Sequence, residues 1–267
     1  MSDLFRIRAR LSTPLTIALG VVPVVLLVGL WFLVTAGATV ESRIISPVIL
    51  PSPLEIVGQI SSLWFERELS RSAIQSIIRV AGGFSLAMVI AVPLGIAMAA
   101  FSPIRALFNP VAAVGGYLPI SALVPLTLSW FGIGELQKVV FLALAGFVVL
   151  LPLVIQAVDD VDDVYLKTAY TLGASRTQAV MRVLIPVSLA GIFDALRLVV
   201  GVGWTYILLA EMVSAERGLG NLIIVAQRRG PREHIYLVLI VIIVIAFVTD
   251  RTLATIGKAL FPYREAR

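Results

Sequence analysis

Charged side chains are missing from four long stretches of this 267-residue chain. The stretches are 11–40, 80–104, 106–134 and 139–158. Because a helix that crosses a bilayer needs about 20 mostly apolar residues, each stretch is long enough to hold one membrane span. Two shorter uncharged stretches, 198–210 and 235–249, reach that length only when flanking charged residues are included.

This apolar pattern predicts six membrane-spanning helices. Their expected ranges are 15–38, 75–101, 105–131, 138–157, 188–212 and 235–258. The composition agrees, because 59% of the residues are hydrophobic, only 14% are charged and the mean hydropathy is +1.01, whereas soluble chains average about 25% charged residues. We therefore predict an all-α integral membrane protein with a single transmembrane domain over residues 1–267.

Basic residues near both ends predict how the chain is oriented in the membrane. Three arginines lie within residues 6–10, ahead of the first apolar stretch. Since Lys and Arg accumulate on the cytoplasmic side of membrane proteins, the N-terminal tail 1–14 is expected in the cytoplasm. Six spans would return the C-terminus, with the basic residues of 258–267, to the same side.

The first apolar stretch also resembles a secretory signal peptide, because Ala36-Gly37-Ala38 mimics a cleavage site. Its apolar run is about twice the 7–15 residues usual for such a signal, which favours a retained span. The formal net charge of +5 is expected to face anionic lipid rather than nucleic acid in so apolar a chain.

The connection between the first two spans predicts a short amphipathic helix on the outer face, at about 53–65. Ser52 can accept a hydrogen bond at the helix start, Pro53 suits the first helical position, and Glu55 completes a capping box. We expect this helix to rest on the membrane surface.

Prolines interrupt the third predicted span. Pro110, Pro119 and Pro125 each remove a backbone donor within it, and the span ends near Trp130. Broken backbone at membrane depth is tolerated where protein covers it or where it lines an aqueous path. We expect this helix to line a translocation pathway; the alternative is a kinked helix that only packs.

Ionisable and aromatic residues in the fifth predicted span extend the candidate pathway. Asp194 and Arg197, three residues apart, can either pair with each other or serve a function. The full set of candidate pathway residues is Pro119, Pro125, Trp130, Trp204, Tyr206 and Glu211. Packing is an alternative role for these residues, and a hydrogen-bonded structural carboxylate is the alternative for Glu211.

The segment 159–187, between the fourth and fifth spans, predicts a projecting pair of helices on the cytoplasmic side. Four aspartates within 159–163 can cap a first helix that runs from Tyr165 to Leu172. Gly173 can end that helix in a left-handed conformation, and Ser175 with Gln178 forms a second capping box for a helix that runs to Pro186. Such an elbow offers a docking surface to a partner; the alternative is a passive loop.

No catalytic constellation is found in the sequence. The chain contains 0 Cys and 1 His, and no G-x-x-x-x-G-K-[ST] motif that would bind ATP. The single histidine, His234, is expected at the surface of an outer loop, and no metal site is predicted. We expect this chain to bind no cofactor and to be no enzyme by itself.

The cytoplasmic segment resembles the E-A-A loop of ABC importer permeases. In that family the pattern is E-A-A, three residues, Gly, nine residues and I-x-L-P. Here it is Lys167-Thr168-Ala169, then Gly173, then Val183-Leu184-Ile185-Pro186 at the same spacing. Lys167 stands where the family has a glutamate, which puts the usual salt bridge of that residue in doubt.

Further motifs resemble one branch of these type I permeases, the one for nitrate, bicarbonate, taurine and aliphatic sulfonates. Examples are Leu50-Pro51-Ser52-Pro53, Trp130-Phe131-Gly132-Ile133-Gly134-Glu135, Ala210-Glu211 and Arg217-Gly218-Leu219-Gly220. The resemblance implies a permease fold with a coupling helix between helices 4 and 5. It assigns ATPase coupling to Lys167, Thr168, Ala169, Leu172, Gly173, Ala174, Ser175, Arg176 and Pro186.

The same resemblance implies the partners of the chain. Two permease subunits, expected as a homodimer, would form a pore in the bacterial plasma membrane. Two ATPase subunits would bind ATP and Mg in the cytoplasm, and an external binding protein would deliver a small solute. The alternative is a self-contained secondary carrier or channel, which would need neither partner.

Overall fold

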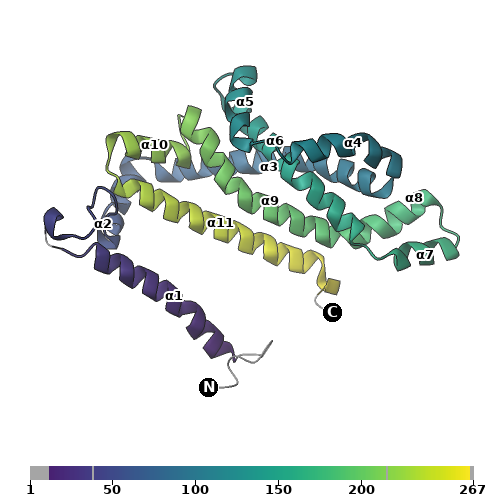
Figure 1. Ribbon diagram of the computed structural model, residues 1–267, viewed down its shortest axis with the longest axis horizontal. Coiled ribbons are helices and arrows are strands. Elements are labelled where there is room, and N and C mark those ends of the chain that lie inside the picture. The colour runs from purple at the N-terminus through teal and green to yellow at the C-terminus, as the bar shows by residue number, and fades with distance from the viewer. Residues whose placement is uncertain (1–11, 38, 215, 265–267) are drawn as a thin grey trace.

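A computed structural model describes residues 12–37, 39–214 and 216–264, and helices are the only regular elements in this part of the chain (Figure 1). The α-helices are α1 (Thr13–Val34), α2 (Pro53–Gly58), α3 (Leu69–Ala100), α4 (Ser102–Gly115), α5 (Leu123–Phe131), α6 (Glu135–Asp159), α7 (Asp163–Thr171), α8 (Arg176–Ala179), α9 (Ile185–Ser214), α10 (Leu219–Arg229) and α11 (Glu233–Leu260). The predicted all-α fold class is confirmed.

Among the residues that the structure describes, five helices are long and apolar enough to cross a membrane: α1, α3, α6, α11 and the continuous helix Arg176–Val213, which joins α8 to α9. The predicted third span, 105–131, is not one helix. It consists of α4 and α5, whose axes are bent by 86°, and Pro119 lies in the break between them. Counting the bent pair as one span gives the six that the sequence predicts.

The core of the molecule lies where α3, α6 and α9 pack against one another. Small residues bring their backbones close: a Cβ on Gly83 would lie 2.4 Å from the Cβ of Leu142, and one on Gly203 would lie 2.1 Å from the ring of Phe84. Lipid is as apolar as these side chains, so close van der Waals contact rather than hydrophobic transfer holds membrane helices together.

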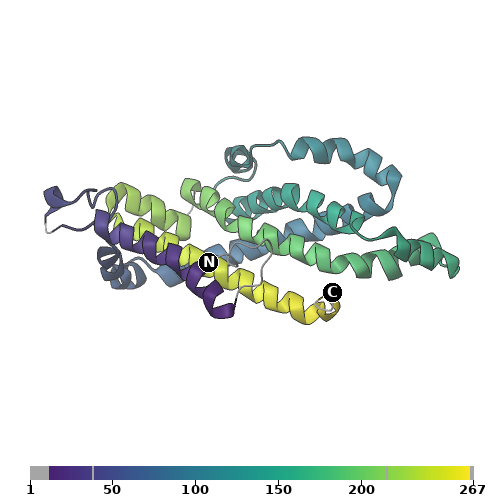
Figure 2. The same cartoon turned by 60° about the horizontal axis from the view of Figure 1, so that its bottom comes forward.

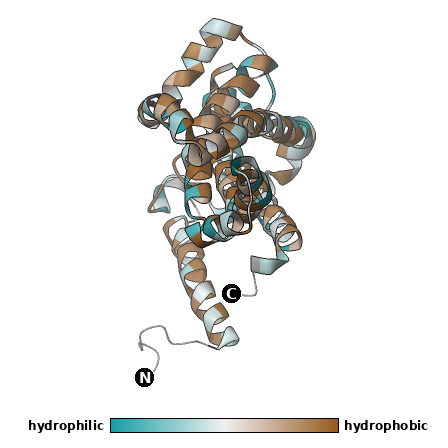
Figure 3. Cartoon of the chain, turned by 90° about the vertical axis from the view of Figure 1, so that its right-hand side faces the viewer, coloured by the Kyte–Doolittle hydropathy of each residue, from teal (hydrophilic) through white to brown (hydrophobic). Residues whose placement is uncertain are grey.

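The first helix stands apart from this core in Figure 1, and in Figure 2 it passes in front of α11. No residue of α1 is buried, and its end is fastened by a hydrogen bond of 3.0 Å from Trp31 Nε1 to the carbonyl of Pro51. Apolar residues predominate along the helices (Figure 3), and many large apolar side chains are exposed, as expected of faces that meet lipid or another subunit. Residues 1–11 of the predicted tail 1–14, and Ala38 of the cleavage-like motif, lie outside the described residues.

The two ends of the long axis carry different short helices (Figure 1). We call them the α7–α8 end and the α2–α10 end. At the latter, the capping box predicted from Ser52 and Glu55 is present. The helix predicted at 53–65 is only partly formed, because α2 ends at Gly58 and a π turn, Ser62–Glu66, follows.

Helix α10 is absent from the sequence prediction. It lies between the last two spans and buries Leu219, Leu222, Ile223 and Ala226, which recur at helical spacing. Arg217, just before this helix, and Arg228, in its last turn, give the segment the composition of a polar loop.

Candidate functional site

The α7–α8 end is built from local capping interactions. Asp162 Oδ1 accepts a hydrogen bond of 2.9 Å from the Val164 amide and so caps α7. Gly173, at φ +82, ends the helix: its amide donates to the Tyr170 carbonyl at 3.0 Å and the Ala174 amide donates to the Ala169 carbonyl at 3.0 Å. These two bonds form a Schellman motif, which satisfies carbonyls that the helix end would leave unpaired.

The second arm of the elbow starts at Ser175. Its hydroxyl accepts from the Gln178 amide at 3.3 Å, and its own amide donates to Gln178 Oε1 at 2.9 Å. Contrary to the sequence prediction, this helix does not end at Pro186. It runs through the π turn Val180–Leu184 directly into α9, and Pro186, which has no amide to donate, follows this locally widened turn.

The coupling residues predicted from the sequence share this elbow but differ in exposure. Leu172 is 83% exposed, and Gly173, Ser175 and Arg176 are also exposed. The Lys167 side chain is 75% exposed, with its Nζ 3.9 Å from Asp163 Oδ2. The remaining coupling residues behave as follows: Thr168 bonds the Val164 carbonyl, Ala169 is buried, Ala174 is half-buried and Pro186 is exposed.

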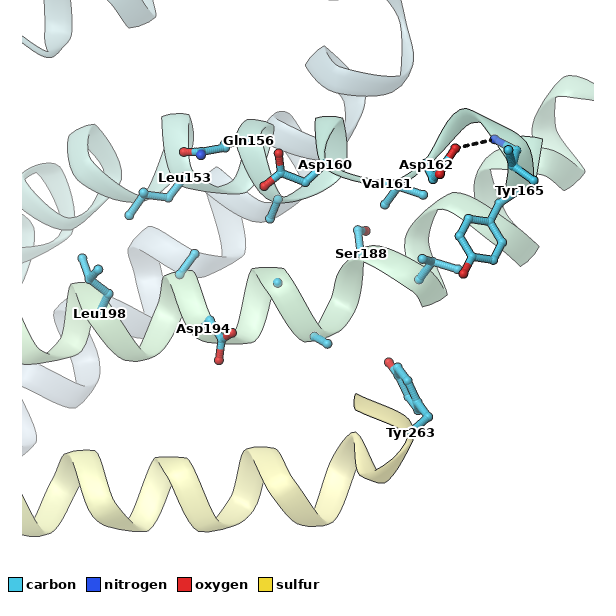
Figure 4. A pocket seen from close by; sticks show the side chains of 16 residues that line it. Leu153, Gln156, Asp160, Val161, Asp162, Tyr165, Ser188, Asp194, Leu198 and Tyr263 are labelled. Atoms are coloured by element: carbon cyan, nitrogen blue, oxygen red, sulfur yellow. Dashed lines mark hydrogen bonds between the residues drawn. The ribbon is translucent and has the colours of Figure 1, made fainter. Parts of the chain in front are cut away.

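A cleft of about 960 Å³ separates α6 and the start of α7 from α9 at the base of the elbow (Figure 4). Asp160, Asp194, Tyr165 and Tyr263 are among its lining residues. The elbow is joined to the bundle on both sides of this cleft, through the short connection from α6 to α7 and through the continuous helix α8–α9.

A buried ionic network lies next to α10, toward the other end. Arg79 of α3 donates from Nη1 to Glu211 Oε1 of α9 at 2.7 Å, and from Nη2 and Nε to Glu135 of α6 at 2.5 and 2.7 Å. The Arg79 and Glu211 side chains are 3% and 0% exposed, and Glu135 is 56% exposed. One guanidinium therefore connects three spans.

The same network anchors the start of α10. Glu211 accepts from the Ser76 hydroxyl at 2.8 Å and from the Gly220 amide at 2.9 Å, and the Leu219 amide donates to Ser76 Oγ at 3.0 Å. Lys138 lies nearby, 3.9 Å from Glu135 and bonded to the Gly134 carbonyl at 3.0 Å. Two cations thus balance two carboxylates, as buried charges require.

The candidate pathway residues fall into two groups that the structure does not bring together. Pro119, Pro125 and Trp130 are exposed along the α4–α5 break. Trp204 and Glu211 are buried within the core and Tyr206 is half-buried. Burial favours the packing role for the second group, and its hydrogen bonds make Glu211 a structural carboxylate in this conformation.

Two ionisable residues lie in surroundings that the sequence does not indicate. Arg197, for which the sequence offers Asp194 as one possible partner, donates from Nε and Nη2 to Asp250 of α11 at 2.5 and 2.7 Å, which joins α9 to α11. His234 is not a surface residue of an outer loop. It is the second residue of α11 and is buried, because the last span begins here and α11 packs against α2 and α10.

Membrane-length helices, with a projecting helical elbow at one end, define a multi-pass membrane protein. The chain belongs to the family of the binding-protein-dependent transport system inner membrane component, which matches residues 91–261. It is therefore an ABC importer permease subunit.

Its relatives agree with this assignment. The chain is 30% identical to the taurine transport system permease protein TauC of Escherichia coli, over 95% of this chain and 91% of that protein. It is 27% identical to a Bacillus subtilis permease named for aliphatic sulfonates transport, over 84% of this chain and 81% of the relative. Its fold resembles the solved MetNI methionine ABC transporter, with a TM-score of 0.65, 18% identity, and coverage of 72% of this chain and 95% of the other. The type I importer permease fold is thereby confirmed.

Proposed function

We propose that two copies of this chain form the pore of an ATP-driven importer that admits a small sulfonate or related oxyanion by alternating access. The observation that carries the proposal is the exposed elbow at the α7–α8 end, which continues without interruption into the helix Arg176–Val213. The arrangement gives a partner on one side of the membrane a mechanical connection to the other side.

The elbow has the chemistry of a docking surface. Leu172, Tyr170 and Met181 expose apolar side chains there, although the segment lies beyond the predicted membrane spans. Exposed apolar groups rimmed by polar ones are typical of protein contact sites. We assign this surface to two ATPase subunits, which bind the ATP and Mg that this chain has no motif to hold.

Lys167 gives the docking surface a charge that the family pattern does not have. Its only acidic contact within the described residues is with Asp163 at 3.9 Å, between two well-exposed side chains, and such a pair contributes little to stability. The ammonium therefore remains available to a carboxylate of the partner ATPase.

The pathway is proposed to run beside the α4–α5 break. Pro119, Pro125 and Trp130 are exposed there, and the broken backbone needs either protein or water around it. A second copy of the chain, packed against this surface, would cover its apolar side chains and leave the backbone facing the path. A homodimer satisfies both needs.

The elbow supports the proposed orientation. Because ATPases act in the cytoplasm, the α7–α8 end faces inward, as do the N- and C-termini. This agrees with the arginines within residues 6–10. The α2–α10 end then faces outward, in a bacterial plasma membrane, where an external binding protein delivers the solute. The sulfonate class rests on the two relatives named for taurine and aliphatic sulfonates.

Purification of the tagged chain from native membranes in mild detergent tests this proposal. We expect an ABC ATPase to co-purify, and the complex reconstituted in liposomes to take up radiolabelled taurine only with ATP inside and the binding protein outside. Uptake by the chain alone, driven by an ion gradient, would instead establish a secondary carrier.

A further inference from the structure

The ionic network next to α10 has a role that follows from its geometry. We infer that Arg79 joins the far end of the continuous helix α8–α9 to the connection between α5 and α6. We also infer that the contact between Arg79 and Glu135 breaks and re-forms during transport. This inference rests on the proposed function, because it presupposes that ATPases move the α7–α8 end.

The continuous helix can carry such a movement across the membrane. It comprises 38 residues, Arg176–Val213, and at 1.5 Å per residue its length is roughly 55 Å. It begins at the docking elbow, and Glu211 lies in its last turn. A displacement at Arg176 therefore reaches Glu211 without passing through any loop.

The two carboxylates that Arg79 binds are held very differently. Glu211 is fully buried and accepts from Ser76, Arg79 and the Gly220 amide. Separating it would leave buried groups unpaired, which is costly. Glu135 is 56% exposed, so water can replace Arg79 as its partner, while the buried guanidinium keeps Glu211 and the Arg217 carbonyl as acceptors. The Arg79–Glu211 contact is the permanent one, and the Arg79–Glu135 contact can be released.

The segment attached to Glu135 has room to move. The connection from α5 to α6 is Gly132-Ile133-Gly134, and no atom lies within 4 Å of where a Cβ would stand on either glycine. Gly132 adopts φ +68, a conformation that favours glycine. The Gln137–Thr127 hydrogen bond of 3.0 Å holds the middle of α5 to α6, so release of Glu135 would allow the connection and the end of α5, with Trp130 on it, to shift and change the proposed pathway.

The absence of cysteine from the chain permits a direct test with one reporter. Ile133 is 78% exposed on the connection, so Ile133→Cys can be labelled with a membrane-impermeant maleimide. The labelling rate is measured in the complete complex with its ATPase, first without nucleotide and then trapped with ATP and vanadate. We expect the rate to differ between the two states.

Added to this reporter, Glu135→Gln should abolish the difference between the two labelling rates, and Glu135→Asp, which keeps the charge, should retain it. Glu68→Gln is the matched control. Glu68 is 43% exposed, and it forms ion pairs with Arg71 and Arg217 rather than with Arg79. The Glu68→Gln control should show the same two labelling rates as the reporter alone. If Glu135 had only a structural role, Glu135→Gln would lower the thermal stability and leave the difference between the two labelling rates unchanged.

The outcomes separate this inference from the proposed function. The inference would be overturned if the two nucleotide states differed in labelling rate by the same amount with and without Glu135→Gln. It would also be overturned if the labelling rate of Ile133→Cys did not change with nucleotide in a complex that hydrolyses ATP. Failure to recover any ATPase with the chain would count against the proposed function instead.

Discussion

Arg79 of α3 and Glu211 of α9 are 132 residues apart in the sequence and form an ion pair, with Nη1 and Oε1 separated by 2.7 Å. Both side chains are almost completely enclosed by the protein. Charged groups in such surroundings persist because each satisfies the other and because Ser76 and the Gly220 amide supply further hydrogen bonds.

Removing one partner of this pair should be more damaging than removing both. Arg79→Met leaves the Glu211 carboxylate buried without its counter-charge, and we expect the free energy of unfolding to fall by about 3–5 kcal/mol. In the double variant Arg79→Met with Glu211→Gln, the remaining amide can still accept from Ser76 and Gly220, so most of the loss should be recovered. The thermal unfolding midpoint of the purified complex measures the loss in the single variant and its recovery in the double variant. A double variant less stable than Arg79→Met would contradict this account.

The left-handed backbone at Gly173 makes that residue the sensitive point of the docking elbow. Any other L-residue there is strained by about 1–2 kcal/mol, and Gly173→Asp also adds a charge to the docking surface. We expect this variant to insert normally but to lose its ATPase and all transport. Gly58→Asp is the matched control, because Gly58 is exposed and has no atom within 4 Å of its Cβ position. Full transport by Gly173→Asp at normal expression would refute the assignment.

The charge of Lys167 should select the partner ATPase. Reversing it in Lys167→Glu places a carboxylate opposite the acidic residue that we expect on the ATPase, so co-purification should fall and recover as salt screens the repulsion. Lys167→Arg should bind normally. Arg228→Glu makes the same charge change at the α2–α10 end, where Arg228 is exposed, and should leave ATPase binding unchanged. Equal binding by Lys167→Glu and the wild type would show that this ammonium meets no acid.

The sequence predicts features that depend on neighbouring residues. Uncharged runs locate the spans, and the capping boxes at Ser52 and Ser175 are present because each joins groups only three residues apart. Helix α10 is a different case. A helical spacing of apolar residues is present in this segment, at Leu219, Leu222, Ile223 and Ala226. A search for long stretches without charged residues does not detect it, because the helix is short and has arginines at its end.

The ionic network could be predicted only in part. Arg79 falls inside the predicted span 75–101, and a charge inside a span is by itself a sign of a specific partner. Which partner it has depends on how α3, α6 and α9 pack, and Glu135 and Glu211 are 56 and 132 residues away. The Arg197–Asp250 pair was missed for the same reason, since the nearby Asp194 offered a local alternative that tertiary packing overrides.

Acid should loosen α2 through one carboxyl group. The Arg43 guanidinium, together with the Ser52 amide, holds the pKa of Glu55 at about 2, below the value of about 4.3 for an unfolded chain. A depressed folded-state pKa stabilises α2 above the unfolded value, and this stabilisation is lost as the pH falls from about 4 toward 2.

Hydrogen exchange of the α2 amides, corrected for its intrinsic pH dependence, measures this loss. In the wild type we expect protection at pH 6 and a decline below pH 4. In Glu55→Gln, which cannot carry the charge that pairs with Arg43 at 2.8 Å, protection should be lower at pH 6 and should change little with acid. Glu66→Gln serves as the control, because Glu66 bonds only to Ser62 within its own turn among the described residues, and it should follow the wild-type profile. An acid-sensitive Glu55→Gln variant would mean that another carboxyl group governs α2.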